Sequence, residues 1–232
     1  GAARLPALPN PPIPQLQHTP ALPPMRYVIE QLAVGFGAAT GVLAGRGKRI
    51  DLFGVIVLGL VTALGGGTLR DLVLDAPVFW VQDANFIVTG VLAAGVMFVA
   101  VRYTHPPESL LQVADAVFLA FVVMLGTAKT ANLGHAWPVC IVLGVATGVA
   151  GGMLRDVLCG QIPLVFRTHI YLYATAAMVG AVVYLAGSLW LGKHPANLLI
   201  GAGTILILRL AALRWQIRLP EFDPEGTGQP PS

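Results

Sequence analysis

Hydrophobic residues are gathered into seven long stretches, separated by short polar segments that often contain glycine or proline. The stretches run approximately over residues 27–44, 52–69, 84–101, 110–128, 138–158, 170–191 and 198–213. Each approaches the roughly 20 residues that a helix needs to cross a bilayer, and each is longer than the strands of a membrane barrel. Because lipid-exposed backbone must satisfy its own hydrogen bonds, the pattern predicts an all-α membrane protein with seven transmembrane helices.

The composition narrows the possible functions. Of the 232 residues, 56% are hydrophobic and 11% are charged, against about 25% charged in ordinary soluble domains. The net charge of +3 comes from basic residues scattered between the apolar stretches, so we expect no nucleic-acid partner. We also expect no enzyme and no metal site, because the sequence lacks a phosphate loop, a nucleophile motif and histidines at ligand spacing.

The two ends of the chain are polar or rich in proline. Residues 1–24 lack the apolar core of a signal peptide, and we interpret them as a flexible tail; residues 216–232 form a polar C-terminal tail. Lysine and arginine are more frequent in the segments on one side of the membrane, and such an excess marks the cytoplasmic side. This distribution places the N-terminus outside and the C-terminus in the cytoplasm. The basic residues that this orientation places inside are Arg46, Lys48, Arg49, Arg102, Arg155, Arg167, Arg209, Arg214 and Arg218.

The second and fifth apolar stretches are similar in sequence at an offset of 85 residues. LFGVIVLGLVTALGGGTLRD, ending at Asp71, aligns with WPVCIVLGVATGVAGGMLRD, ending at Asp156, and the same register pairs Glu30 with Asp115. Three stretches separate equivalent positions, so the two copies must cross the membrane in opposite directions. We therefore predict two inverted three-helix repeats, over residues 25–105 and 108–191, followed by a seventh helix over residues 195–215.

Glycines interrupt the two repeated helices at equivalent places, and each costs about 1 kcal/mol relative to alanine in a helix interior. We expect a break that turns backbone groups toward a water-filled ion path. The alternative is close helix packing, which small residues also permit. The residues concerned are Gly65, Gly66 and Gly67 in the first copy and Gly151 and Gly152 in the second, with the nearby hydroxyls of Thr62, Thr68 and Thr147.

Four charged residues follow these glycines, namely Arg70, Asp71, Arg155 and Asp156. Ionisable groups are costly at membrane depth and indicate a functional site by default. Because sequence neighbours do not face each other on a helix, we expect each arginine to pair with another element rather than with the adjacent aspartate. A network that only locks the repeats together is the alternative to one that contacts permeating ions.

Three further charged residues lie within the apolar stretches or directly at their ends. Lys129 ends the fourth stretch and has Ala44 as its repeat counterpart; it is a gate candidate, or a lysine that extends to the membrane surface. Glu30 and Asp115 occupy equivalent positions. They are candidates for buried partners of basic groups or for proton-carrying sites, with solvation at the interface as the alternative.

The duplicated GGGTLRD and AGGMLRD segments, with DLFG before the first and PLVFRTHIYLYATAA after the second, resemble the prokaryotic branch of the trimeric intracellular cation (TRIC) channel family, also labelled UPF0126 or glycine-transporter-type. The resemblance implies a homotrimer in the inner membrane. Each protomer would hold its own pore, lined by glycine-kinked second and fifth helices and conducting potassium, with sodium as a second candidate.

The resemblance also assigns residues. Gly65, Gly66 and Gly67 match the first kink, Gly151 and Gly152 match the second, and Lys129 matches a lysine placed in the pore; Ala150 departs from the usual glycine. The resemblance implies no cofactor. We expect membrane lipid as a further partner.

Two other function classes stay open at this point. Inverted repeats with interrupted helices are also typical of secondary transporters, so transport of a small solute such as glycine is the alternative to a channel. A scaffold without transport activity is the third class.

Overall fold

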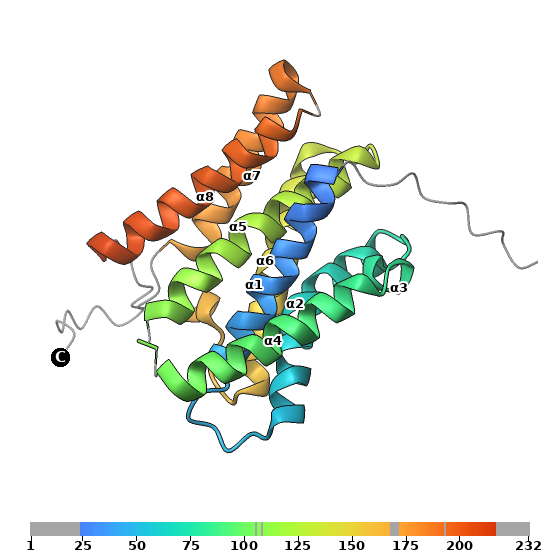
Figure 1. Ribbon diagram of the computed structural model, residues 1–232. Coiled ribbons are helices and arrows are strands. Elements are labelled where there is room, and N and C mark those ends of the chain that lie inside the picture. Colours follow the sequence, from blue (N-terminus) through green and yellow to red (C-terminus); the bar gives the residue numbers. More distant parts are fainter. Residues whose placement is uncertain (1–23, 105, 108, 168–171, 193, 217–232) are drawn as a thin grey trace, which may run out of the picture.

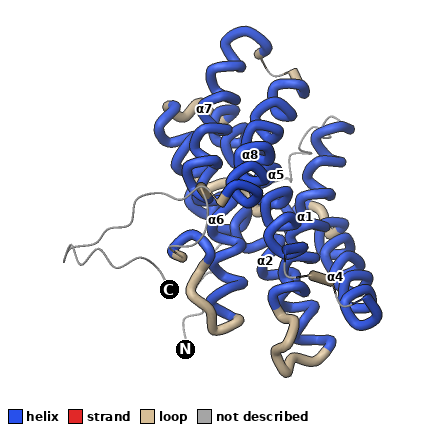
Figure 2. Tube along the Cα trace, turned by 90° about the vertical axis from the view of Figure 1, so that its left-hand side faces the viewer, coloured by secondary structure: helices blue, strands red, loops and turns tan. Residues whose placement is uncertain are grey.

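The computed structural model describes residues 24–104, 106–107, 109–167, 172–192 and 194–216. The two predicted tails lie almost wholly outside the described residues. Within these ranges the chain forms helices and loops (Figures 1 and 2). The elements are α1 (Pro24–Ala44), α2 (Leu52–Val73), α3 (Phe79–Gln82), α4 (Asn85–Thr104), α5 (Ser109–Asn132), α6 (Trp137–Leu158), η1 (Leu164–Phe166), α7 (Tyr173–Leu191) and α8 (Pro195–Trp215).

Seven of these helices are long and apolar enough to cross a membrane, which confirms the predicted all-α class and the seven spans. Local sequence explains several of their ends. The Asp51 carboxylate caps α2 by accepting a hydrogen bond from the Gly54 amide (2.8 Å), and α6 and α8 each begin with proline in the first turn. Gly192 ends α7 with a positive φ of 57°, a conformation that favours glycine.

The long helices form a bundle around α5, which packs against α1, α6, α7 and α8. Figure 1 shows α7 and α8 together on one side of the bundle and α4 on the other. In α5, the residues from Phe118 to Ala120 and from Val122 to Ala128 are buried. The helix most enclosed by protein is therefore the one that carries Lys129.

Small residues bring neighbouring helices into close contact at positions that recur 85 residues apart. On α1, a methyl group added at Gly41 would lie 2.7 Å from the Cα atom of Gly59 on α2. On α5, a methyl group at Gly126 would lie 3.1 Å from the Cα atom of Gly144 on α6. These equivalent contacts show that α1 packs on α2 in the same way as α5 packs on α6, through backbones that approach where side chains are absent.

Candidate functional site

The glycine-rich segments of α2 and α6 lie where these two helices pack together. Both helices are continuous through their glycines, so the backbone is not unwound there, and the ion path along these glycines stays a prediction. The cost of glycine in a helix interior is offset here by packing, the alternative left open by the sequence. Gly65 faces the side chain of Leu154, and Gly67 faces the ring of Phe79.

The contact between α2 and α6 is reciprocal. A methyl group at Gly66 would collide with the backbone oxygen of Thr147, and one at Gly151 would collide with the backbone oxygen of Thr62. Gly66 and Gly151 are repeat equivalents, as are Thr62 and Thr147. Such a pair of contacts is what a local two-fold axis between the two helices produces. Because glycine lacks a side chain, the two backbones approach at both points.

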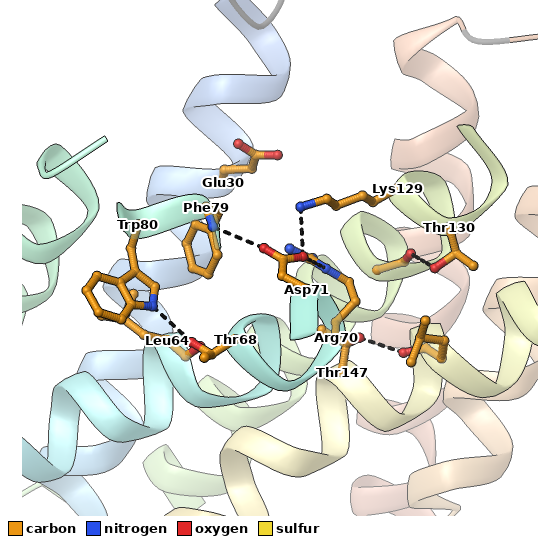
Figure 3. A network of polar contacts seen from close by, with 12 residues as sticks. Glu30, Leu64, Thr68, Arg70, Asp71, Phe79, Trp80, Lys129, Thr130 and Thr147 are labelled. Atoms are coloured by element: carbon orange, nitrogen blue, oxygen red, sulfur yellow. Dashed lines mark hydrogen bonds and ion pairs between the residues drawn. The ribbon is translucent and has the colours of Figure 1, made fainter. Parts of the chain in front are cut away.

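The three threonine hydroxyls near these glycines donate to carbonyl oxygens one turn earlier in their own helices. Thr62 donates to Leu58 (2.7 Å), and the equivalent Thr147 hydroxyl donates to Leu143 (2.5 Å). Thr68 donates to the Leu64 oxygen (2.8 Å) and accepts from the indole Nε1 of Trp80 (2.9 Å) (Figure 3). Thr68 thus ties the short helix α3 to α2, a role that the sequence does not reveal because Trp80 lies outside the apolar stretches.

Asp71 is the centre of a buried ionic cluster in the last turn of α2. Its Oδ1 accepts from Arg70 Nε (2.7 Å) and from Lys129 Nζ on α5 (2.7 Å), and its Oδ2 accepts from the Phe79 amide at the start of α3 (3.0 Å) (Figure 3). The Asp71 side chain is fully buried, whereas that of Lys129 is 22% exposed. The aspartate therefore joins α2, α3 and α5, and Lys129 is its most accessible partner.

A second cluster surrounds Asp156, the repeat equivalent of Asp71. Asp156 Oδ1 accepts from Arg155 Nε (2.8 Å), and its Oδ2 accepts from the Leu164 amide (2.8 Å). Arg155 Nη1 also donates to Asp115 on α5 (2.7 Å), and both of these side chains are fully buried. The expectation that each arginine avoids its adjacent aspartate is thus wrong in both repeats. The flexible arginine side chain bends toward the next residue at the helix end, and in the second repeat its guanidinium also reaches α5.

Helix α8 covers the second cluster. The Arg209 guanidinium carbon lies 4.6 Å from the centre of the Tyr173 ring, and Arg209 is almost completely buried. The Tyr173 hydroxyl and the carboxylate of Asp115 both lie close to Gly152. Sequence analysis missed Tyr173 as part of this cluster and placed Arg209 only by topology. A buried arginine within an apolar helix was the available signal for Arg209.

The two clusters lie at opposite ends of the bundle. Asp71 and Lys129 are in the last turns of α2 and α5, and a short turn leads from α5 into α6. Helix α6 then crosses the bundle and carries Arg155 and Asp156 in its own last turns. We call these the Asp71 end and the Asp156 end.

A cavity of about 740 Å³ opens at the Asp71 end. Its polar lining carries both signs of charge: Arg26, Glu30, Arg70, Asp83 and Lys129. Its deeper wall includes Ala63 and Gly67 of α2 and Val122 and Leu125 of α5, so it extends well into the membrane-spanning region. The residues of this lining come from α1, α2, α5, the region around α3 and the start of α4.

Glu30 lies on this cavity and accepts from Arg26 Nε one turn earlier in α1 (3.1 Å). Glu30 and its equivalent Asp115 are therefore both partners of arginines, one of the roles that the sequence left open. The arginines differ in kind: Arg26 is on the same helix as Glu30, whereas Arg155 comes from a neighbouring helix. Arg26 was missed as a site residue, and its spacing of four residues from Glu30 was the available signal.

In the part of the chain that the structure describes, no group of three or more His, Cys, Asp or Glu side chains is arranged to hold a metal ion. Cys140 and Cys159 are both buried and free.

Comparison with known proteins places the chain among its relatives. A family model described as "Glycine transporter" matches residues 27–102 and again residues 112–188. The chain belongs to this family. The two matches begin 85 residues apart, which is the period of the repeat found in the sequence. Family members include the UPF0126 inner membrane protein YadS of Escherichia coli K12, 40% identical over 207 residues that cover 88% of this chain and 99% of the relative.

Solved structures of the same fold agree with the predicted TRIC resemblance. A trimeric intracellular cation channel orthologue from Rhodobacter sphaeroides superposes with a TM-score of 0.74 at 32% identity, covering 83% of this chain and 98% of that one. A structure described as "Structural basis for conductance through TRIC cation channels" gives a TM-score of 0.76 at 29% identity, covering 86% and 98%. These relatives are channels and membrane proteins rather than enzymes, as the sequence analysis expected.

Proposed function

We propose that this protein is a cation channel that conducts potassium, and also sodium, through a path inside each protomer. The observation that carries the proposal is the Lys129 ammonium, which is bound to Asp71 beside a cavity that extends into the membrane-spanning region. A positive charge in such a path repels permeating cations, so its displacement is a direct way to switch conduction. The names of the related TRIC structures support the cation class.

The proposed path enters the cavity at the Asp71 end and continues past the contact between α2 and α6 toward the Asp156 end. Gly67 and Ala63 leave α2 without bulky side chains along the cavity wall. Beyond the cavity, the close approach of the two helices at Gly66 and Gly151 is the narrow part of the path. Conduction then requires a small displacement of α2 relative to α6 that separates the two backbones at these contacts.

We propose a homotrimer in the inner membrane, with the N-terminus outside and the C-terminus in the cytoplasm. The Rhodobacter sphaeroides relative is described as trimeric, and the Escherichia coli relative as an inner membrane protein. The excess of basic residues at the Asp156 end supports this orientation.

A second candidate function is carrier transport of a small zwitterion such as glycine. The cavity presents arginine and lysine side chains together with the carboxylates of Glu30 and Asp83, and both signs of charge suit an amino acid. Saturable uptake of labelled glycine into proteoliposomes, driven by an ion gradient, would favour this candidate.

The deciding experiment is planar-bilayer recording of the purified full chain in asymmetric potassium chloride. We expect unitary current steps that reverse near the potassium equilibrium potential. Lys129→Ala should raise the open probability, whereas Lys129→Arg, which keeps the positive charge, should stay closer to the original protein. If the unsubstituted protein and Lys129→Ala were both folded and neither gave a current, the channel proposal would be contradicted. Carrier transport would then be the remaining candidate.

A further inference from the structure

The two repeats carry equivalent carboxylates, Glu30 and Asp115, that are held very differently. Asp115 receives Arg155 Nη1 at 2.7 Å, and neither side chain is exposed. Glu30 receives Arg26 Nε at 3.1 Å, and the two side chains are 15% and 27% exposed. Among the described residues, no ion pair joins Glu30 to Arg70, although Arg70 is the equivalent of Arg155. Glu30 is thus the more loosely held carboxylate, and it faces the cavity.

Asp71 has two hydrogen-bond donors besides Lys129. Its equivalent, Asp156, is held by the adjacent arginine Nε and by a backbone amide eight residues downstream, and among the described residues no lysine joins it. Asp71 has the same two donors, from Arg70 and Phe79, and Lys129 is added to them. If Lys129 left, Asp71 would therefore keep an arginine Nε and a backbone amide as donors, the same two kinds of donor that hold Asp156 in the other repeat.

Lys129 and Glu30 line the same cavity from two neighbouring helices, α5 and α1. Figure 3 shows the Glu30 carboxylate and the Lys129 ammonium on facing sides of the space above Asp71. A lysine has a flexible four-carbon stem, so its ammonium can change partners by rotation within the side chain. Transfer from one carboxylate to another also avoids leaving the ammonium unpaired at membrane depth, which would be costly.

We propose that Glu30 is a positioning residue for the gate: it receives the Lys129 ammonium when Lys129 leaves Asp71, and Arg26 competes for the same carboxylate while the path is closed. This inference rests on the proposed channel function. It names the two states of the lysine, paired with Asp71 or paired with Glu30. It also assigns opposite effects to Glu30 and Arg26, which a merely structural pair would not have.

Single-channel recording of substituted full-length protein tests the inference. Glu30→Gln removes the second acceptor and should lower the open probability about fivefold, the size expected for loss of one partly exposed ion pair. Arg26→Gln frees the Glu30 carboxylate from its arginine and should raise the open probability. Asp75→Asn is the matched control, because Asp75 is exposed just after α2 at the same end of the bundle and is not part of the cavity lining. It should leave the open probability within about twofold.

The same substitutions in a Lys129→Ala background separate gating from structure. Both the Glu30→Gln and the Arg26→Gln effects should disappear there, because their target is absent. Glu30→Asp, which retains the charge, should behave more like the original protein than Glu30→Gln does, and it replaces that variant if Glu30→Gln fails to fold.

The outcomes distinguish this inference from the proposed function. Currents in the original protein, with Glu30→Gln no different from Asp75→Asn, would overturn the role of Glu30 and leave the channel standing. A Glu30→Gln effect that persists without Lys129 would overturn it too. Absence of current in both the original protein and Lys129→Ala would remove the channel and this inference with it.

Discussion

Gly66 on α2 lies directly against the backbone carbonyl oxygen of Thr147 on α6. The repeat-related contact between Gly151 and the carbonyl of Thr62 completes a reciprocal pair. Two helices of different sequence thus approach through their backbones at two equivalent points. This relationship explains why glycine is required at both positions in helices that are nevertheless continuous.

Substitution of these glycines tests the close approach. Gly66→Ala should lower the free energy of unfolding by about 1–3 kcal/mol, because the added methyl group forces backbone apart in a packed region. Thermal unfolding in detergent, followed by size-exclusion chromatography, measures the shift. Gly95→Ala on α4 is the matched control, since no atom of the described part of the chain lies within 4 Å of a methyl group there. Equal effects at Gly66 and Gly95 would contradict the packing role.

Loss of an arginine should affect the two repeats unequally. Arg155→Met leaves the buried carboxylates of Asp115 and Asp156 without their shared cation and should cost about 3–5 kcal/mol of stability. Arg70→Met should cost less, because Asp71 keeps Lys129 as a cationic partner and Glu30 has its own arginine. The two variants can be compared by thermal unfolding under one set of conditions. A larger loss for Arg70→Met would show that the second cluster is not the tighter one.

Removal of Lys129 should change conduction more than stability. Lys129→Ala should alter the unfolding free energy by less than about 1 kcal/mol, because the ammonium is partly exposed and Asp71 retains two donors. Open probability in bilayer recordings should rise at the same time. A variant that unfolds readily and conducts as before would reverse both expectations and make the lysine a structural clamp.

The Thr68 hydroxyl should contribute to stability through α3. Thr68→Val preserves the shape of the side chain but removes the acceptor for Trp80 Nε1, and we expect a loss of about 1 kcal/mol. Thr204→Val on α8 provides the control, because that exposed hydroxyl donates to the Ile200 oxygen in its own helix. Thermal unfolding of both variants is the measurement. A direct role for Thr68 in the ion path would appear instead as a changed unitary conductance.

The sequence by itself determined the membrane-spanning helices and the repeat. Both depend on local properties: a continuous apolar stretch must become helical in lipid, whatever its neighbours are, and a duplication is visible in the residue order. The predicted spans therefore agree closely with the observed helices, although α2 continues past Leu69 to include Arg70 and Asp71 in its last turns. The helix α3 was not predicted, because its four residues carry no periodic pattern.

Only the tertiary structure decided which charges meet and what the glycines do. Glu30 and Asp115 are equivalent in sequence, yet Asp115 meets Arg155 across two helices, whereas Glu30 pairs within α1 and faces a cavity. Lys129 reaches Asp71 from 58 positions along the chain. Such pairings depend on helix contacts that hydrophobicity does not specify, since every span is apolar. A run of glycines likewise occurs both in interrupted helices and in tightly packed ones. The close approach of α6 to α2 shows that the glycines of this chain serve packing.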